Sequence, residues 1–146
     1  MIDKKFIGKV IADFRTTAAA SQLRFFAKAT GETNPVYTSE GAARDAGHPG
    51  LPLPPTFLFS LELVQPPSGW RDELGIKIER ILHGEQSFDY HRMAYAGDTL
   101  HLQTRITDIY EKKGGALDFV VRETRVTNQD GEHVADLRSV LVQRNG

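Results

Sequence analysis

Alternation of apolar and polar residues in the C-terminal half is the feature that most constrains how this chain folds. From Ile76 onward the pattern has a period of two, which is typical of strands with one buried face. Gly114-Gly115 and the segment 128–131 separate these runs and predict hairpin turns with no helix between them. The alternating residues are Leu100, Leu102, Thr104 and Ile106, then Leu117, Phe119 and Val121, and finally the run from Val134 to Val142. We therefore expect long antiparallel strands that bury one face against another part of the chain.

The N-terminal half carries helix and turn signals instead, so the predicted fold class is α+β. Thr17 is placed to cap a helix that Gly31 ends. Ser39 is placed to cap a short second helix over Glu40 to Ala46, which Gly47 closes. The inward positions of the first helix follow the i, i+3, i+4, i+7 rule and are Leu23, Phe26, Ala27 and Thr30.

The segment from Phe57 to Val64 is apolar nearly all round and is the one stretch apolar enough to cover the predicted sheet. Thr56 follows Pro54-Pro55 and is a candidate cap, and Pro66-Pro67 provides a stop. A short apolar run can be a buried strand or a buried helix, but the cap and stop signals favour a helix.

The length of 146 residues fits one domain spanning 1–146, and a domain of this size buries about 68–70 % of its unfolded surface. Eighteen Lys and Arg against nineteen Asp and Glu leave no basic face, which argues against nucleic-acid and membrane partners. The absence of cysteine excludes disulfides, thiolate metal sites and a Cys nucleophile. No stretch has the apolar length of a signal segment or a membrane span, so we expect a soluble, cytoplasmic protein.

The most informative stretch is Gly31-Glu32-Thr33-Asn34-Pro35-Val36-Tyr37. It resembles the hydratase motif of MaoC-like proteins, Gly-Asp-x-Asn-Pro-x-His. Three further segments resemble parts of the same family: Pro54-Pro55-Thr56-Phe57, Leu82-His83-Gly84-Glu85-Gln86 and Gly97-Asp98-Thr99-Leu100. The segment that begins at Leu82 resembles one typical of the family's N-terminal-type, fatty-acid-synthase-like dehydratase domains. The resemblance covers roughly Phe6 to Val142. It implies a single hot-dog fold, in which an antiparallel sheet wraps around a central apolar helix.

The resemblance also implies a chemistry, the addition or removal of water next to the carbonyl of an acyl thioester. In the family the motif Asp and His hold one water, because imidazole can act as a general base near neutral pH and a carboxylate can orient the water. Backbone N–H groups at the start of the central helix, here Thr56 and Phe57, would stabilise the enolate-like oxygen. The substrate would be a 3-hydroxyacyl or enoyl thioester of coenzyme A or acyl carrier protein, and no further cofactor is expected.

Two residues depart from the family pattern. Glu32 stands at the Asp position and keeps the negative charge, so it could still orient a water. Tyr37 stands at the His position, and a phenol with an ordinary pKa near ~10 is a poor general base at pH 7. The two-residue mechanism therefore does not simply transfer to this chain.

The candidate catalytic residues are Glu32, Tyr37 and His83, and the candidate substrate-binding residues are Asn34, Pro55, Thr56, Phe57, Gly84 and Glu85. His83 and Glu85 would face the same side of a regular strand and so form an alternative acid–base pair. Each candidate also has a structural interpretation: Glu32 as a solvated carboxylate, Asn34 as a turn former, Tyr37 as a pocket wall and His83 as a structural donor.

No metal site is expected. The remaining histidines are interpreted as solvated positions without ligand-like surroundings, namely His48, His91, His101 and His133. Ser60 lacks a neighbouring base and a Gly-x-Ser-x-Gly turn, which argues against a serine hydrolase.

Three functions remain open. The first is a hydratase or dehydratase of acyl thioesters. The second is a non-catalytic acyl-binding subunit that pairs with a MaoC-like chain carrying the intact Asp and His, and the third is a hot-dog thioesterase in which Glu32 activates water. Because an open sheet edge favours pairing, we expect a homodimer or higher even oligomer, or a heterodimer with a second MaoC-like subunit.

Overall fold

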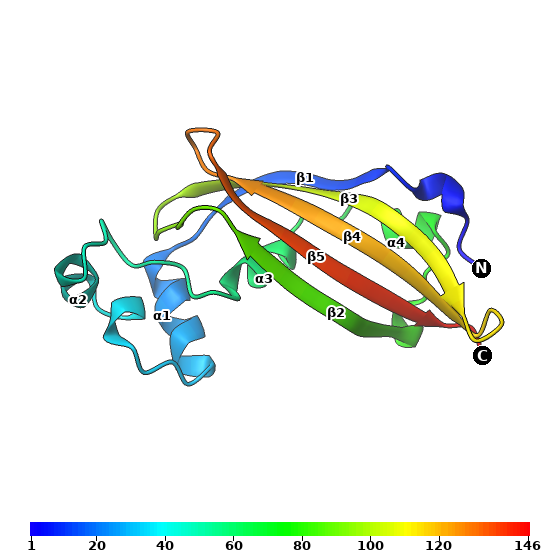
Figure 1. The fold of residues 1–146 in the computed structure, drawn as a ribbon, viewed down its shortest axis with the longest axis horizontal. Helices are drawn as coiled ribbons and strands as arrows, with labels where there is room; N and C mark the ends of the chain where they lie inside the picture. The colour runs from blue at the N-terminus through cyan, green and yellow to red at the C-terminus, as the bar shows by residue number, and fades with distance from the viewer.

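The computed structural model describes residues 1–146 and contains one five-stranded antiparallel sheet in the order β1-β3-β4-β5-β2. The strands are β1 (Val10–Thr17), β2 (Ile81–Tyr90), β3 (Thr99–Lys112), β4 (Leu117–Thr127) and β5 (His133–Arg144). The α-helices are α1 (Ala20–Ala29), α2 (Glu40–Asp45), α3 (Phe57–Glu62) and α4 (Trp70–Glu73), and the 3-10 turns are η1 (Lys4–Phe6), η2 (Pro35–Tyr37) and η3 (Ile78–Arg80). The long strands curve along the molecule, with α1 and α2 at one end and both termini at the other (Figure 1).

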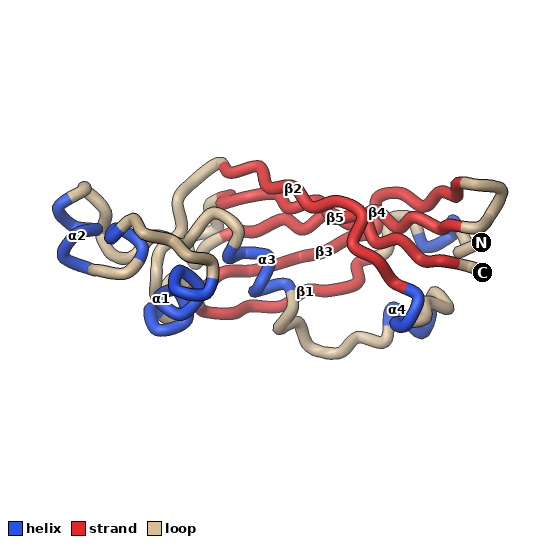
Figure 2. The backbone as a smooth tube through the Cα atoms, turned by 90° about the horizontal axis from the view of Figure 1, so that it is seen from below, coloured by secondary structure: helices blue, strands red, loops and turns tan.

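The helix α3 lies against one face of the sheet, as seen from below in Figure 2. Its residues Phe57, Leu58 and Leu61 are at most 4 % exposed and belong to the main core cluster. On the sheet, the same cluster includes Leu100, Leu102, Val126 and Leu137. Burying each of these side chains contributes roughly 1.5–3 kcal/mol, so the contact between α3 and the sheet dominates this end of the core. The sheet wrapped around an apolar helix confirms the predicted hot-dog fold.

The N-terminal half contains a strand that the sequence did not predict. Residues Val10–Thr17 form the edge strand β1, which precedes the first helix. Thr17 is the last paired residue of β1 and does not cap α1, which begins at Ala20. The Ala19 N–H donates to the Gln22 side chain instead, at 3.1 Å. The strand escaped detection because a register shift between Val10 and Ala12 disrupts its alternation and because an edge strand keeps many polar residues.

The second predicted helix is confirmed. Ser39 accepts a hydrogen bond from the Ala42 N–H at 3.2 Å and so caps α2, and Gly47 follows its end with a positive φ of 90°. The central helix is shorter than predicted, since α3 ends at Glu62 and the next two residues, Leu63 and Val64, are 67 % and 59 % exposed. Thr56 precedes α3, but its side chain makes no capping hydrogen bond. No helix is long and apolar enough to cross a bilayer.

Candidate functional site

The loop after α1 is fixed by a helix-ending turn at Gly31. Its N–H donates to the Lys28 carbonyl at 3.2 Å, and the Glu32 N–H donates to the Ala27 carbonyl at 2.9 Å. This pair of bonds is the Schellman arrangement, and it requires the positive φ of 72° that Gly31 adopts. The turn therefore sets where the half-buried Glu32 side chain lies.

Polar side chains of this loop bond to its own backbone. The Glu32 Oε1 accepts from the Asn34 N–H at 2.9 Å, and the Asn34 Oδ1 accepts from the Val36 N–H at 3.1 Å. Asn34 thus caps η2 and is a turn former, as its structural interpretation predicted. Glu32 commits one carboxylate oxygen to the loop, and the other has no hydrogen-bond partner within the chain.

Tyr37 sits at the end of η2 and neighbours Tyr90, the last residue of β2. The Tyr90 hydroxyl donates a hydrogen bond to the Pro55 carbonyl, just before α3. Burial and the adjacent Tyr37 phenol raise the pKa of Tyr90 to about 12, so its hydroxyl stays protonated and remains a donor. Tyr90 joins the motif loop, the sheet and the start of α3, and it was not among the residues predicted from the sequence. Its only sequence signal is the inward alternation of Phe88 and Tyr90 along β2.

The two backbone amides expected to face a thioester oxygen are not equivalent. The Phe57 N–H already donates to the Pro54 carbonyl at 2.9 Å. Thr56 is exposed, and its N–H makes no bond within the chain, so it is the available donor. The Phe57 side chain is buried and packs edge-on against Phe26, with ring centroids 5.3 Å apart, which fixes the start of α3.

The predicted pairing of His83 with Glu85 is wrong, because a bulge at Gly84 turns the two side chains to opposite faces of the sheet. His83 lies opposite Leu141 on the inner face, whereas Glu85 lies opposite Val140 on the outer face, and the register shifts between them. Glu85 forms an ion pair with Arg138 at 2.8 Å, on the outer face.

Gly84 and Glu85 were predicted to bind substrate, and the structure gives both a structural role. A Cβ at Gly84 would lie 2.8 Å from Val142 Cγ2 and 3.1 Å from the Val140 carbonyl oxygen, so this position lets β2 approach β5 closely. His83 is also remote from the motif loop. Tyr90 lies seven positions further along β2, a span of roughly 20 Å. The structure therefore brings Tyr37 near Pro55 and Thr56 but leaves His83 elsewhere.

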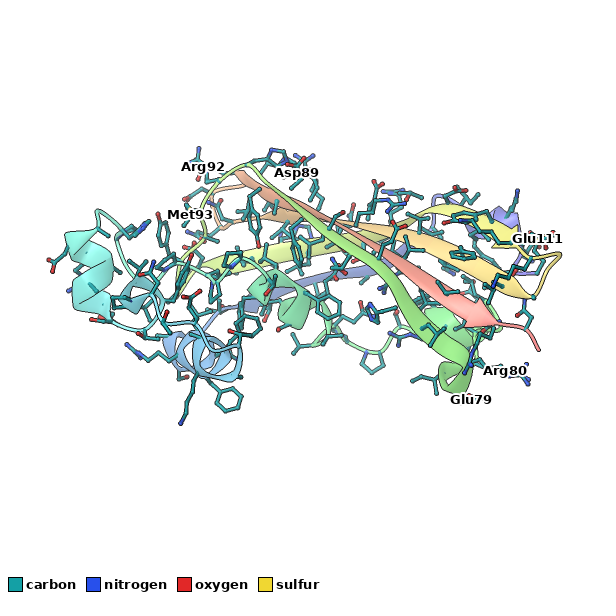
Figure 3. The ribbon with its side chains drawn as sticks, turned by 60° about the horizontal axis from the view of Figure 1, so that its bottom comes forward. Glu79, Arg80, Asp89, Arg92, Met93 and Glu111 are labelled. Carbon is teal, nitrogen blue, oxygen red and sulfur yellow. The ribbon has the colours of Figure 1, made fainter.

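His83 instead borders a cavity of about 940 Å³ on the inner face of the sheet, between α3, α4 and β2. The His83 ring packs edge-on against Phe59, with centroids 5.3 Å apart. Glu79, labelled in Figure 3 beside Arg80, lies at the α4 end of this cavity. The other charged and aromatic residues that line it include Glu62, Trp70, Arg71 and Arg122.

Charged groups in this cavity are only partly satisfied. Burial raises the pKa of Glu62 above its ordinary value, opposed by a hydrogen bond from the Thr124 hydroxyl and by the charges of Arg122 and His83. Burial lowers the pKa of Arg122, whose Nη2 donates to Ser139 Oγ at 2.8 Å. The buried Glu62 Oε2, Arg122 Nε and Trp70 Nε1 have no hydrogen-bond partner within the chain. The lining of the cavity is therefore partly charged, with three polar atoms that have no partner within the chain.

Two histidines that were interpreted as unconnected and solvated lie together. His91 Nε2 is 3.0 Å from Asp136 Oδ2, and His133 Nε2 is 2.8 Å from Asp136 Oδ1. These three residues form the one group with ligand atoms close enough to hold a metal ion. The other two histidines do not join it, since His48 contacts Tyr95 and His101 contacts Asp13.

The curved sheet, the short apolar helix and the Gly31–Tyr37 loop define a hot-dog domain of the MaoC-like dehydratase type. Residues 5–137 match the family described as FAS1-like, dehydratase domain region, and the chain belongs to this family. A UPF0336 protein of Streptomyces coelicolor is 36 % identical over 129 residues, covering 84 % of this chain and 81 % of that protein.

Solved structures resemble the chain over most of its length. The C-terminally truncated HadBC (3R-hydroxyacyl-ACP dehydratase) complex from Mycobacterium tuberculosis has a TM-score of 0.79 and 27 % identity, covering 94 % of this chain and 96 % of that one. A MaoC-like dehydratase has a TM-score of 0.77 and 24 % identity, covering 92 % of this chain and 42 % of that one. The ChsH1-ChsH2 complex from M. tuberculosis has a TM-score of 0.71 and 22 % identity, covering 93 % and 87 %. The last two likenesses concern the fold alone.

Proposed function

We propose that this chain is the substrate-holding subunit of a two-chain hydratase/dehydratase that acts on 3-hydroxyacyl or enoyl thioesters of coenzyme A or acyl carrier protein. The observation that carries the proposal is Tyr37, which places a phenol where the family has its general base. The imidazole predicted as its alternative, His83, does not replace it, because His83 lies roughly 20 Å away along β2. The HadBC dehydratase, a complex of two hot-dog subunits, supports a two-chain assembly.

In this proposal the chain binds and orients, and the partner performs the proton transfers. The Thr56 N–H donates to the thioester oxygen, which becomes negative as the C2–C3 double bond accepts water. Tyr37 borders the same place, and Tyr90, whose hydroxyl donates to the Pro55 carbonyl, holds the loop before α3 in position. The partner's base takes a proton from water, the hydroxyl adds to C3, and the proton is returned at C2. No cofactor beyond the thioester carrier is needed.

The acyl tail would run along α3 toward the inner-face cavity. Six helical residues span about 9 Å, so a thioester at Thr56 would place the tail near Phe59 and the mouth of that cavity after several carbons. The tail would contact the apolar lining residues Phe59 and Leu63 of this cavity of about 940 Å³ rather than its unpartnered polar atoms.

The partner would pack along β2, which is an unpaired edge of the sheet. Several large apolar residues are exposed on or beside this strand: Leu63, Val64, Ile78, Leu82 and Tyr90. These side chains do not lie on one face, since Leu82 and Tyr90 point to opposite sides of β2, but exposed apolar groups at a sheet edge fit a chain of the same fold placed side by side with this one. A stable monomer in sedimentation velocity, alone and with the candidate partner at micromolar concentration, would contradict this arrangement.

Hydration of crotonyl-CoA, followed by the loss of enoyl absorbance, tests the division of labour. We expect the purified chain alone to be slow or inactive, since a well-matched general base contributes about 10²–10⁴-fold. Tyr37→His should raise the rate at least ~10-fold, and adding Glu32→Asp should raise it further by a non-additive factor. The matched control is Tyr110→His on the outer face, which should change nothing.

Two outcomes would overturn the proposal. Efficient hydration by the unmodified chain, lost on Glu32→Ala, would show a self-sufficient hydratase that uses the second oxygen of Glu32. Release of free thiol from acyl-CoA, without loss of enoyl absorbance, would indicate a thioesterase. Mixing the chain with a MaoC-like chain from the same organism that carries the intact Asp and His should restore full activity.

A further inference from the structure

The outer face of the sheet carries a compact group of donors where β2 ends and β5 begins. His91 follows β2, while His133 and Asp136 lie on β5. Both imidazoles direct Nε2 toward the same carboxylate, at 3.0 Å and 2.8 Å, and their ring centroids are 4.3 Å apart. Asp89 is a fourth member, with its Oδ2 4.0 Å from His91 Nε2. The group lies where β2 ends, marked by Asp89 and Arg92 in Figure 3, while Glu79 and Arg80 mark the start of the same strand.

Backbone contacts hold these side chains in place. The N–H groups of His91 and Arg92 both donate to the Val134 carbonyl, at 2.8 Å and 3.1 Å. Asp89 and Asp136 are direct partners in the β2–β5 register, so their carboxylates occupy opposed positions on one face. Like charges in that arrangement destabilise a sheet unless a cation lies with them.

None of the neighbouring arginines forms an ion pair with the group, although Arg125 lies opposite Asp136 in the β4–β5 register. Arg92 pairs with Glu132 at 3.1 Å, and Arg138 pairs with Glu85 at 2.8 Å. Burial alone would raise the pKa of Asp136, but hydrogen bonds from His91 and His133 outweigh it, and the pKa lies below the ordinary value. The group therefore consists of two carboxyl groups and two imidazoles, partly exposed and paired only with one another.

We propose that His91, His133, Asp136 and Asp89 bind a divalent cation of the zinc type. Zn²⁺ takes imidazole nitrogen and carboxylate oxygen at about 2.0–2.2 Å, which places neighbouring ligand atoms of a tetrahedron roughly 3.4 Å apart. The two close His–Asp separations need to open by only a few tenths of an ångström. Two imidazoles favour zinc, copper or nickel over magnesium and calcium, which prefer oxygen ligands.

The ion would tie the end of β2 to the start of β5. His91 directly follows Tyr90, whose hydroxyl holds the Pro55 carbonyl before α3. The metal site therefore steadies the segment that links the sheet to the candidate substrate loop. This inference does not depend on the proposed acyl-thioester function, because its test measures metal binding alone.

The test is titration of Zn²⁺ into chelator-treated protein without a polyhistidine tag, by calorimetry, with Co²⁺ absorbance as a report of tetrahedral ligation. We expect one ion per chain, a raised melting temperature, and no displacement by a large excess of Mg²⁺ or Ca²⁺. His133→Ala and Asp136→Asn should each weaken binding by at least ~10-fold. The matched control is His101→Ala, which removes a histidine that contacts one carboxylate, Asp13, without a second imidazole.

Asp136→Asn preserves side-chain shape and guards against a loss of folding in His133→Ala, and circular dichroism checks both. Equal Zn²⁺ affinity in the unmodified chain, His133→Ala and Asp136→Asn would overturn the proposal. So would equal weakening by His101→Ala, because it would show adventitious binding to scattered histidines. In either case the group would be only a hydrogen-bonded His–Asp–His cluster.

Discussion

At the Tyr90 end of β2, polar side chains are satisfied by nearby backbone, whereas at the His83 end buried polar atoms are left without partners. The Glu32 carboxylate, the Asn34 amide and the Tyr90 hydroxyl each bond to a main-chain group. Glu62 Oε2 and Arg122 Nε, together with Trp70 Nε1, have no partner within the chain. An unpartnered buried group costs about 1–3 kcal/mol, so the second end carries a stability cost that the first does not.

This difference indicates how each end contributes to function. Hydrogen bonds to the backbone fix a loop in one geometry, which suits an end that orients a thioester. Uncompensated charges lining a cavity suit an end that receives a ligand or a partner chain, since both can supply missing partners. The following predictions test whether the two ends really differ in this way.

The largest effect on stability is expected from Gly84→Val, which places a side chain at the bulge that turns His83 to the inner face of the sheet. The new side chain would collide with Val142 and the Val140 carbonyl, so we expect a loss of about 2–3 kcal/mol in the free energy of unfolding. Urea denaturation measures it. Ser87→Val, also on β2 but exposed, should change stability by no more than about 0.5 kcal/mol. Equal effects of the two variants would mean that β2 does not approach β5 closely at Gly84.

A smaller loss is expected from Tyr90→Phe at the opposite end. The variant removes the hydrogen bond to the Pro55 carbonyl while keeping the ring, so stability should fall by about 1 kcal/mol. Tyr110→Phe is the control, because the Tyr110 ring stacks on Phe119 on the outer face and its hydroxyl makes no hydrogen bond within the chain. A Tyr90→Phe protein as stable as that control would show that the hydroxyl does not hold the start of α3.

The smallest effect, with the opposite sign, is expected from Glu62→Gln. The raised pKa of Glu62 means that the folded chain favours the protonated form of this side chain. The contribution of the protonated Glu62 to the free energy of unfolding is complete below the pKa of the unfolded chain and is lost as pH rises through the pKa of the folded chain. The stability of Glu62→Gln relative to the unmodified chain should therefore increase with pH from about 4.5 upward. Melting temperatures from pH 4 to 8 measure the trend, with exposed Glu111→Gln as a flat control. A pH-independent difference would place Glu62 in contact with solvent.

Local signals predicted those parts of the fold that local interactions determine. The Gly31 turn, the Ser39 cap and the hairpins of the C-terminal half depend on residues close in sequence, and all are present. The edge strand β1 was missed, because it is identified by pairing with β3 from ninety residues away rather than by its own pattern.

The candidate site shows the same limit. The positions of Glu32, Asn34 and Tyr37 within one loop followed from the motif. The faces of the sheet on which His83 and Glu85 lie depend on a bulge, and a single glycine in a strand does not predict one. Tyr90 and the His91–Asp136–His133 group arise only when β2 and β5 pair, so no spacing in the sequence indicates them.

A buried carboxylate on β4 holds the two ends of the chain together. Asp118 Oδ2 accepts from the Ile2 N–H at 3.1 Å and from Asn145 Nδ2 at 2.9 Å, at the end of the molecule remote from the Tyr37 loop (Figure 1). A short peptide could therefore join the ends, and the chain could be reopened at the 128–131 turn with little change in packing. Such a circularly permuted chain would begin with β5 and keep the motif loop untouched.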